Sequence, residues 1–330
     1  MTTTSMRAVV QERYGPTPED VLGHGRITRP AIGPDDVLVR VHATAVDRGT
    51  WHLMAGLPYP VRAAGFGMRR PKHANPGRSL AGTVAAVGAA VADLRPGDEV
   101  FGIGDATFAE YARARADRLA VKPANLSFTE AAAVPDSGMT ALQAVRTHGR
   151  VRAGERVLVI GASGGVGSFA VQIAAADGAQ VTGVCRTDKA DLVRRLGAHR
   201  VVDYTRDDPT DGGTRYDVII DTGGNRRLSH LRRALSPRGR LVIVGGENGG
   251  RWLGGTDRQL RAHLLSPFVR QRLGSFVASE DAAGLVELRS LLETGAVVPA
   301  VDRTYPLDRA AAAIRHLLDG RAHGKVVITA

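Results

Sequence analysis

The first part of the chain contains short stretches in which apolar and polar residues alternate. Residues 36–42 follow this pattern, and residues 82–88 and 98–102 follow it again, with Pro96 and Gly97 marking the turn between them. Alternation of this kind predicts strands that bury one face. The first 127 residues are therefore expected to form a mostly β domain with many turns.

From residue 128 the pattern changes to alternating strands and helices. Residues 127–130 read Ser-Phe-Thr-Glu and open an Ala-rich helical run. Strands are predicted at 156–160, 180–184, 201–203, 217–221 and 240–244. Helices are predicted at 166–177 and 187–196, and Thr187 is expected to cap the second helix. This alternation predicts a parallel sheet with helices on both faces, a doubly wound α/β domain.

After residue 269 the two kinds of segment mix again. Strands are predicted at 272–279, 299–305 and 325–329, and helices at 281–293 and 308–318. The sequence contains no internal repeat and no low-complexity linker. A chain of 330 residues is long enough for two domains.

Composition narrows the class of protein. Apolar residues make up 43% of the chain, but no run of 18 apolar residues is uninterrupted, so a transmembrane helix is not expected. The first residues lack an apolar signal core, and we expect a cytoplasmic protein. Cys185 is the single cysteine, which excludes an internal disulfide and a four-cysteine zinc site.

The net charge of +11 raises the question of nucleic-acid binding. The arginines are scattered along the chain, often on solvated helix faces, and only four of the 44 basic residues are lysine. Aromatic residues are 5% of the chain, and no nucleic-acid-binding motif is present. We therefore expect a small-molecule partner and neither nucleic acid nor a membrane.

The most informative motif is a glycine-rich turn between a buried strand and a helix. Residues 157–172 read Val-Leu-Val-Ile-Gly-Ala-Ser-Gly-Gly-Val-Gly-Ser-Phe-Ala-Val-Gln. Glycines let the backbone approach a pyrophosphate, and the helix N-terminus offers unpaired N–H groups. Glycine also serves plain turns, but here the strand, helix and next strand follow in the right order. The motif predicts dinucleotide binding.

The end of the second strand of this unit indicates which dinucleotide is bound. NAD is usually held there by an acidic residue on the ribose 2′-hydroxyl, and that acid is missing. Arg186 and Lys189 stand where they could meet a 2′-phosphate instead. The alternative is that they are two solvated surface bases. We expect NADPH.

At this point the chain resembles the zinc-free quinone oxidoreductase, or zeta-crystallin-like, branch of the medium-chain dehydrogenase/reductase superfamily. Segments that fit it in order are Tyr14-Gly15-Pro16, Pro96-Gly97-Asp98-Glu99-Val100, Gly138-Met139-Thr140-Ala141, the glycine-rich turn with Gln172, Val202-Asp203-Tyr204 and Gly324-Lys325-Val326-Val327. Ala175 departs from the signature, which usually has a basic or small polar residue there.

The resemblance implies an architecture and a set of contacts. It implies a GroES-like barrel domain at 1–127, completed by 269–330, a Rossmann domain at 128–268, and a cleft between them where nicotinamide meets substrate. Thr140 is implied near the nicotinamide and Tyr204 near the 2′-phosphate; a homo-oligomer, such as a dimer, is also implied. The expected cofactor-binding set is Thr140, Gly164, Gly165, Val166, Arg186, Lys189, Tyr204 and Gly245.

Zinc-dependent members of the superfamily place three metal ligands at positions that differ here. Asp47 falls at the first, Arg78 at the histidine and Asp136 at the third. Arginine does not bind metal, so no metal is expected. The three residues are candidates for a charge-balanced cluster that braces the pocket or presents Arg78 donors to a carbonyl. Alternatively they are unrelated structural residues.

His52, five residues after Asp47, is a candidate proton-relay residue, although a lone histidine is often structural. The leading hypothesis is an NADPH-dependent reductase that transfers hydride to a quinone or to the β-carbon of an α,β-unsaturated carbonyl, without zinc. The alternatives are a zinc-free NADP-dependent alcohol dehydrogenase or carbonyl reductase, and a non-catalytic NADPH-binding sensor.

Overall fold

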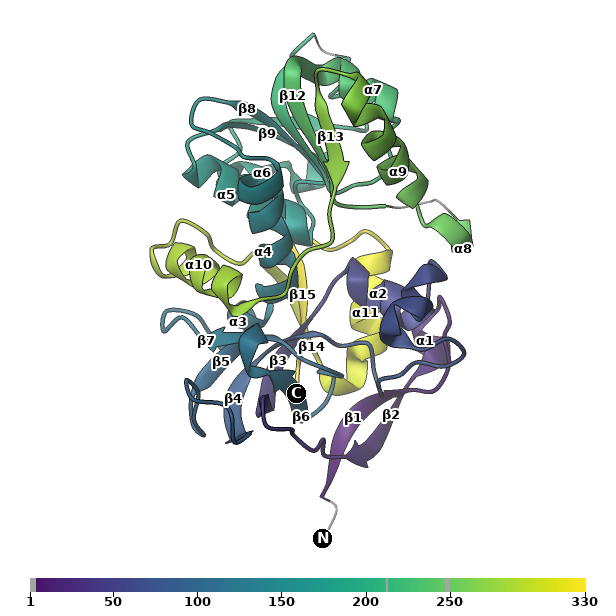
Figure 1. Cartoon of the computed structure of the whole chain (residues 1–330), viewed down its shortest axis with the longest axis vertical. Helices are drawn as coiled ribbons and strands as arrows, with labels where there is room; N and C mark the ends of the chain where they lie inside the picture. The colour runs from purple at the N-terminus through teal and green to yellow at the C-terminus, as the bar shows by residue number, and fades with distance from the viewer. Residues whose placement is uncertain (1–3, 212, 247–249) are drawn as a thin grey trace. The chain divides into compact units, whose positions relative to one another are not determined.

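The computed structural model describes residues 4–211, 213–246 and 250–330, which divide into two compact units (Figure 1). Unit 1 contains residues up to 137, 280–293 and 299–330, and unit 2 contains 138–279 and 294–298. The expected boundaries at 127/128 and 268/269 therefore lie at 137/138 and 279/280. Side-chain contacts explain both differences, because Ser137 and Glu280 bond to Lys325 and Arg78 of unit 1.

Unit 2 is built on a parallel sheet, as the alternating pattern predicts. Its described strands are β8 (Arg156–Ile160), β9 (Gln180–Cys185), β10 (Arg200–Asp203), β11 (Tyr216–Asp221), β12 (Leu235–Ile243) and β13 (Arg272–Ser275). They lie in the order β10-β9-β8-β11-β12-β13, and every neighbouring pair is parallel. This is the strand order of dinucleotide-binding Rossmann sheets.

Helices pack on this sheet and bury its apolar strands. They are α5 (Gly165–Ala176), α6 (Ala190–Arg195), α7 (Leu228–Ala234) and α9 (Thr256–Leu265). The short helix α8 (Gly250–Leu253) has no buried residue. Figure 1 shows α5 and α6 in teal near β8 and β9, and α7 and α9 in green near β12 and β13. One prediction is wrong in detail: residues 187–189 form a 3₁₀ turn and α6 begins at Ala190, so Thr187 does not cap it.

Unit 1 contains a larger sheet organised around one long strand. The strands are β3 (Asp36–Val46), β4 (Ser79–Val87), β5 (Glu99–Ile103), β6 (Tyr111–Arg115), β7 (Leu119–Val121), β14 (Val301–Pro306) and β15 (Lys325–Thr329). The order is β14-β15-β3-β4-β5-β7, with β6 also paired to β3. Because β15 pairs antiparallel with β3, the end of the chain lies beside its early part.

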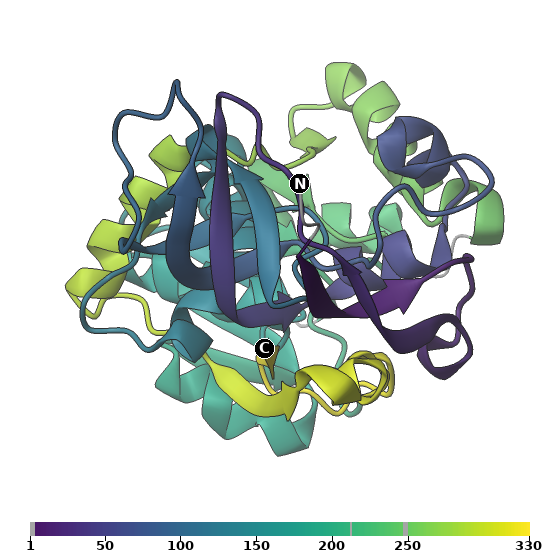
Figure 2. The same ribbon diagram turned by 90° about the horizontal axis from the view of Figure 1, so that it is seen from below.

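A second, two-stranded sheet of unit 1 joins β1 (Ser5–Gln11) to β2 (Leu22–Thr28). Figure 2 shows these purple strands beside the blue strands of the larger sheet, and the amide of Val9 donates to the Phe108 carbonyl, 2.9 Å away. The mostly β character expected of this domain is therefore present.

The helices of unit 1 are α1 (Pro18–Val21), α2 (Arg48–Ala55), a π-helical turn at Arg62–Phe66, α3 (Phe128–Ala132), α10 (Ala282–Glu293) and α11 (Ala310–Leu318), while α4 (Pro135–Leu142) contains the 137/138 boundary. The Ser127 hydroxyl and the Glu130 carboxylate form the capping box of α3. Within the described ranges, no helix has the length and apolar character needed to cross a bilayer.

The turn between β8 and α5 requires glycine at Gly167. A Cβ atom there would lie 2.1 Å from the Gly161 carbonyl oxygen, which no side chain can tolerate. We expect Gly167→Ala to lower the free energy of unfolding by ~2–4 kcal/mol, measured by urea unfolding of the cofactor-free protein.

Gly164→Ala is the matched control in the same turn. Its Cβ would lie 3.3 Å from the same oxygen and its φ is −84°, so stability should change little. Equal stability of Gly167→Ala and the parent protein would contradict the assigned close approach.

Candidate functional site

The glycine-rich turn of unit 2 forms a cradle at the carboxyl end of β8. Gly161 adopts a positive φ of 82°, which favours glycine. Gly164 stands at the N-cap of α5, and no side chain caps this helix. Gly164, Gly165 and Val166 are half-buried, while the residues on either side are buried. The cradle therefore presents backbone N–H groups and a positive helix end to an anion, which fits a dinucleotide pyrophosphate.

The segment directly after β9 carries the charged side chains that were expected to bind the cofactor. Arg186 is exposed and donates to the Asp188 carboxylate, 2.9 Å away. Lys189 is buried, so this lysine is not a solvated surface base. Thr187 donates its hydroxyl to the Asp203 carboxylate at the end of β10.

Tyr204, directly after β10, is 51% exposed and lies close enough to Arg186 for its phenol to affect the guanidinium electrostatically. Arg186, directly after β9, and Tyr204, directly after β10, are thus neighbours. Cys185 is buried beside them, and burial raises the pKa of its thiol to about 11, so it is not a reactive thiolate.

A buried ion pair orders the loops after β11 and β12. The Asp221 carboxylate is fully buried and pairs with the guanidinium of Arg258, 2.6 Å away. Arg258 also donates to the carbonyl oxygen of Gly245, and Asp221 accepts from the amide of Gly224. A Cβ at Gly245 would lie 2.4 Å from the Thr222 carbonyl oxygen. The sequence reasoning missed Asp221, although an acid that ends an apolar strand is a usable signal.

Thr140, the remaining cofactor candidate, lies on α4 and is half-buried. Its proposed contact with the nicotinamide stays a prediction.

In unit 1, Asp47 and Asp136 come together around a buried lysine. Asp47 is the N-cap of α2, where its Oδ1 accepts from the Thr50 amide at 2.9 Å. The Lys325 ammonium, which is 1% exposed, lies 3.7 Å from Asp47 Oδ2 and donates to the Ser137 hydroxyl at 2.9 Å. Sequence reasoning used Lys325 only as part of the terminal motif and missed its role here.

The proton balance of this cluster follows from its charges. Burial and the neighbouring Asp47 carboxylate raise the pKa of Asp136 to about 8, against the opposing charge of Lys325. Glu280 also raises this pKa. Two acids that face one buried ammonium therefore retain one proton at neutral pH, held on Asp136 and shared with Asp47 by a hydrogen bond.

Arg78 pairs with a carboxylate that the sequence reasoning did not consider. Its guanidinium donates to Glu280, which also accepts from Arg118 at 3.3 Å. Glu280 in turn acts on the pKa of Asp136, so the two expected acids and Arg78 belong to one neighbourhood linked by Glu280 and Lys325. The cation beside Asp47 is Lys325, which differs from the expected pairing with Arg78.

His52 has a structural contact in this fold. On α2, its Nδ1 donates to the Leu57 carbonyl oxygen, 2.8 Å away, and its ring meets Trp51 edge-on. The histidine thereby fixes the turn that follows the helix. Its expected role in proton relay stays a prediction.

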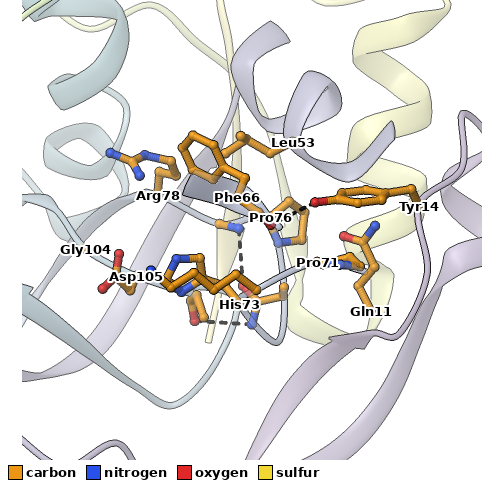
Figure 3. A pocket seen from close by; sticks show the side chains of 14 residues that line it. Gln11, Tyr14, Leu53, Phe66, Pro71, His73, Pro76, Arg78, Gly104 and Asp105 are labelled. Carbon is orange, nitrogen blue, oxygen red and sulfur yellow. Dashed lines mark hydrogen bonds between the residues drawn. The ribbon is translucent and has the colours of Figure 1, made fainter. Parts of the chain in front are cut away.

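An open hollow lies in unit 1 beside Arg78 (Figure 3). Its lining comprises Gln11, Tyr14, Leu53, Phe66, Pro71, Lys72, His73, Asn75, Pro76, Gly77, Arg78, Gly104, Asp105 and Ala106. The Tyr14 hydroxyl donates to the carbonyl oxygens of Phe66 and Gly67, at 2.8 and 2.7 Å. Its walls combine apolar and aromatic side chains with polar and charged ones, as sites for small organic ligands do. We call this hollow the unit 1 pocket.

The charges beside Asp47 do not fit a catalytic zinc ion. Among the described residues, no group of three or more His, Cys, Asp or Glu could hold a metal. The side chain that falls at the histidine-ligand position is Arg78, a cation without a lone pair to donate.

Comparisons with known proteins agree with this architecture. The alcohol dehydrogenase GroES-like domain model matches residues 33–124, and the zinc-binding dehydrogenase model matches 196–328. The chain is 31% identical to a quinone oxidoreductase of Sus scrofa over 98% of this chain and 97% of that protein. It is 32% identical to a chloroplastic NADPH-dependent alkenal/one oxidoreductase of Arabidopsis thaliana, over 98% of this chain and 79% of that protein.

A solved structure gives the same result at the level of the fold. The Escherichia coli quinone oxidoreductase complexed with NADPH superposes with a TM-score of 0.81, at 25% identity, over 98% of this chain and all of that one.

The protonated acid in unit 1 gives a prediction for stability. The folded protein holds a proton that the unfolded chain releases near pH 4, so stability falls as the pH rises from about 4 to about 8 and is level above. Asp136→Asn keeps a hydrogen-bond donor without the titration. From about pH 5 to about pH 9 the free energy of unfolding should fall less in this variant than in the parent protein. The difference between the two decreases should be on the order of 2 kcal/mol, measured by urea unfolding.

Asp117→Asn is the control for this experiment. The hydrogen bond from Arg115 lowers the pKa of the exposed Asp117. The small contribution of Asp117 to the free energy of unfolding is therefore lost only in acid. Between about pH 5 and about pH 9, the change in the free energy of unfolding of Asp117→Asn with pH should match that of the parent protein. An unchanged slope in Asp136→Asn would count against the shared proton.

Proposed function

Because the chain belongs to the quinone oxidoreductase branch of the medium-chain dehydrogenase/reductase superfamily, we propose that it uses NADPH to reduce a quinone or an α,β-unsaturated carbonyl. The observation that carries this proposal is the glycine cradle at the uncapped start of α5, with Arg186 at the end of the neighbouring strand. When bound, the nicotinamide supplies the hydride.

Unit 2 supplies the cofactor contacts in this proposal. The backbone amides at Gly165 and Val166 are positioned to hold the pyrophosphate, because they begin a helix with no side-chain cap. Arg186, which can exchange Asp188 for a doubly charged phosphate, is proposed to bind the 2′-phosphate with Tyr204 beside it. Thr140 and Gly245 complete the proposed set, while the burial of Lys189 favours Arg186 as the main phosphate ligand.

Unit 1 supplies the acid chemistry. After hydride addition the acceptor carries negative charge on its oxygen, which a proton donor or a cation stabilises. Asp136 holds a proton at neutral pH because of its burial and Asp47, and it can supply that proton. The guanidinium of Arg78 can donate further hydrogen bonds to a carbonyl oxygen. We propose these residues for the acceptor side, with His52 as the turn-fixing residue behind them.

The first test concerns cofactor choice. The protein should have a higher kcat/KM with NADPH than with NADH, in assays with a 1,4-quinone and an enone. Arg186→Gln should lower kcat/KM for NADPH about tenfold, which is ~1.4 kcal/mol, and leave the NADH value near the parent.

The control for Arg186 is Arg194→Gln. Arg194 is likewise exposed and paired with a nearby acid, Asp191, but it belongs to α6. Its NADPH kinetics should match the parent. Comparable kcat/KM for the two cofactors in the parent protein would overturn the NADPH assignment.

The second test concerns metal. Protein purified without added metal should contain far less than one zinc per chain by elemental analysis. A chelator should leave the rate of quinone reduction unchanged. The reason is that Arg78 and Lys325 place cations where a zinc ion would need ligands. Stoichiometric zinc together with chelator-sensitive activity would contradict this mechanism. The expected dimer and the cytoplasmic location stay predictions.

A further inference from the structure

The segment that forms most of the unit 1 pocket has an unusual charge composition. Residues 48–92 contain no aspartate or glutamate. Six permanently charged side chains lie in this segment: Arg48, Arg62, Arg69, Arg70, Lys72 and Arg78. Neither the cofactor chemistry nor the proposed proton donor requires such a one-sided distribution.

Three of these cations lie in one tight loop. The amide of Lys72 donates to the Phe66 carbonyl oxygen, 2.8 Å away, and closes the loop 66–72. Gly67 adopts a φ of 105°, and a Cβ there would lie 2.1 Å from the Arg70 carbonyl oxygen. The loop backbone is therefore closely packed on itself, and Arg69, Arg70 and Lys72 are exposed on it.

The pocket begins where this loop ends. Phe66, Pro71 and Lys72 line the pocket, and Arg69 and Arg70 belong to the same loop. We refer to Arg69, Arg70 and Lys72 as the rim cations. Figure 3 shows Phe66 and Leu53 close together on one side of the hollow and Pro71 toward Tyr14 on the other. The apolar side chains and Lys72 thus line one cavity, and the two arginines lie in the loop that provides Phe66, Pro71 and Lys72.

The rim cations lack acidic partners, unlike other cations nearby. Across the parts of the chain that the structure describes, Arg69, Arg70 and Lys72 form no ion pair, whereas Arg78 pairs with Glu280. Three like charges within four residues repel one another. An anion placed among them would relieve this repulsion and gain charge-assisted hydrogen bonds.

The positive potential extends into the pocket. Burial lowers the pKa of His73, and the charges of Lys72, Arg78 and Arg113 lower it further, against Asp105. The Asp105 carboxylate, which opposes these cations, is itself paired with Arg113 at 3.0 Å.

We propose that the unit 1 pocket selects acceptors that carry an anionic tail, such as a carboxylate, which pairs with Arg69, Arg70 and Lys72 while the apolar body lies against Leu53 and Phe66. This inference names the acceptor class of the proposed reductase and rests on that function. The guanidinium groups of Arg69 and Arg70 suit a carboxylate because each presents a planar fork of donors.

Two matched probes test the charge alone. The enone 8-oxonon-6-enoate and its methyl ester share a reacting group and differ only in a remote charge. Their saturated analogues, 8-oxononanoate and its methyl ester, report binding by calorimetry without any turnover. The carboxylate should bind about tenfold more tightly than the ester at low salt, and the preference should shrink in about 0.5 M KCl. The same preference should appear in kcat/KM for the enones.

The double variant Arg69→Gln/Arg70→Gln should reduce the carboxylate preference to about twofold, because each lost guanidinium removes a charge-assisted contact. The control is Arg303→Gln/Arg309→Gln, two exposed arginines of unit 1 on and just after β14, which should retain the full preference. Circular dichroism establishes that both proteins are folded.

The outcomes separate this inference from the proposed function. Equal affinity for carboxylate and ester, or a preference that survives in Arg69→Gln/Arg70→Gln, overturns the anionic-tail site even if both enones are reduced. Carboxylate-selective binding without reduction of either enone by NADPH or NADH overturns the reductase activity and supports the anion site. Selective binding and selective reduction support both.

Discussion

The ammonium group of Lys325 is buried in unit 1, and a buried charge is costly unless counter-charges and hydrogen bonds surround it. Ser137 and Asp47 meet that requirement, and they come from the start of α4 and the N-cap of α2. The last strand, β15, is thereby tied to segments far earlier in the chain. Asp136 adds a second carboxylate, so two negative charges would face the one positive charge of Lys325. A proton held on Asp136 neutralises the excess negative charge. The proposed acid is therefore a result of how this charge is neutralised.

The candidate site of unit 2 is held in place mainly by its backbone conformation and not by charged side chains. Its candidate site consists mainly of backbone atoms in the turn from Gly161 to Val166, and the principal side-chain support is the buried Asp221–Arg258 pair behind the loops after β11 and β12. A site built from backbone tolerates side-chain changes only where no Cβ is obstructed. A site built from charged side chains, as in unit 1, depends instead on the balance of charge among its members.

The sequence allowed the elements of unit 2 to be predicted closely because local signals agree there. β8 begins and ends where the pattern indicates. In unit 1 the same holds for β15, and the capping box at Ser127 is present. Partners distant in sequence were not predictable. Glu280 lies 202 residues from Arg78, and no periodic pattern indicates which carboxylate a given arginine meets. The start of α6 was misplaced because the Thr187 hydroxyl bonds to Asp203, a residue of another strand.

The near-absence of lysine in a basic chain has a practical result for chemistry at the pocket. Of the four lysines, Lys122, Lys189 and Lys325 are buried, and Lys72 alone is exposed. An acylating reagent attacks solvated amines and leaves guanidinium groups intact, since these stay protonated. Apart from the α-amino group, such a reagent would modify a single position, on the rim of the unit 1 pocket. A fluorophore or affinity tag can thus be attached to the unaltered protein beside its proposed acceptor, with no engineered cysteine.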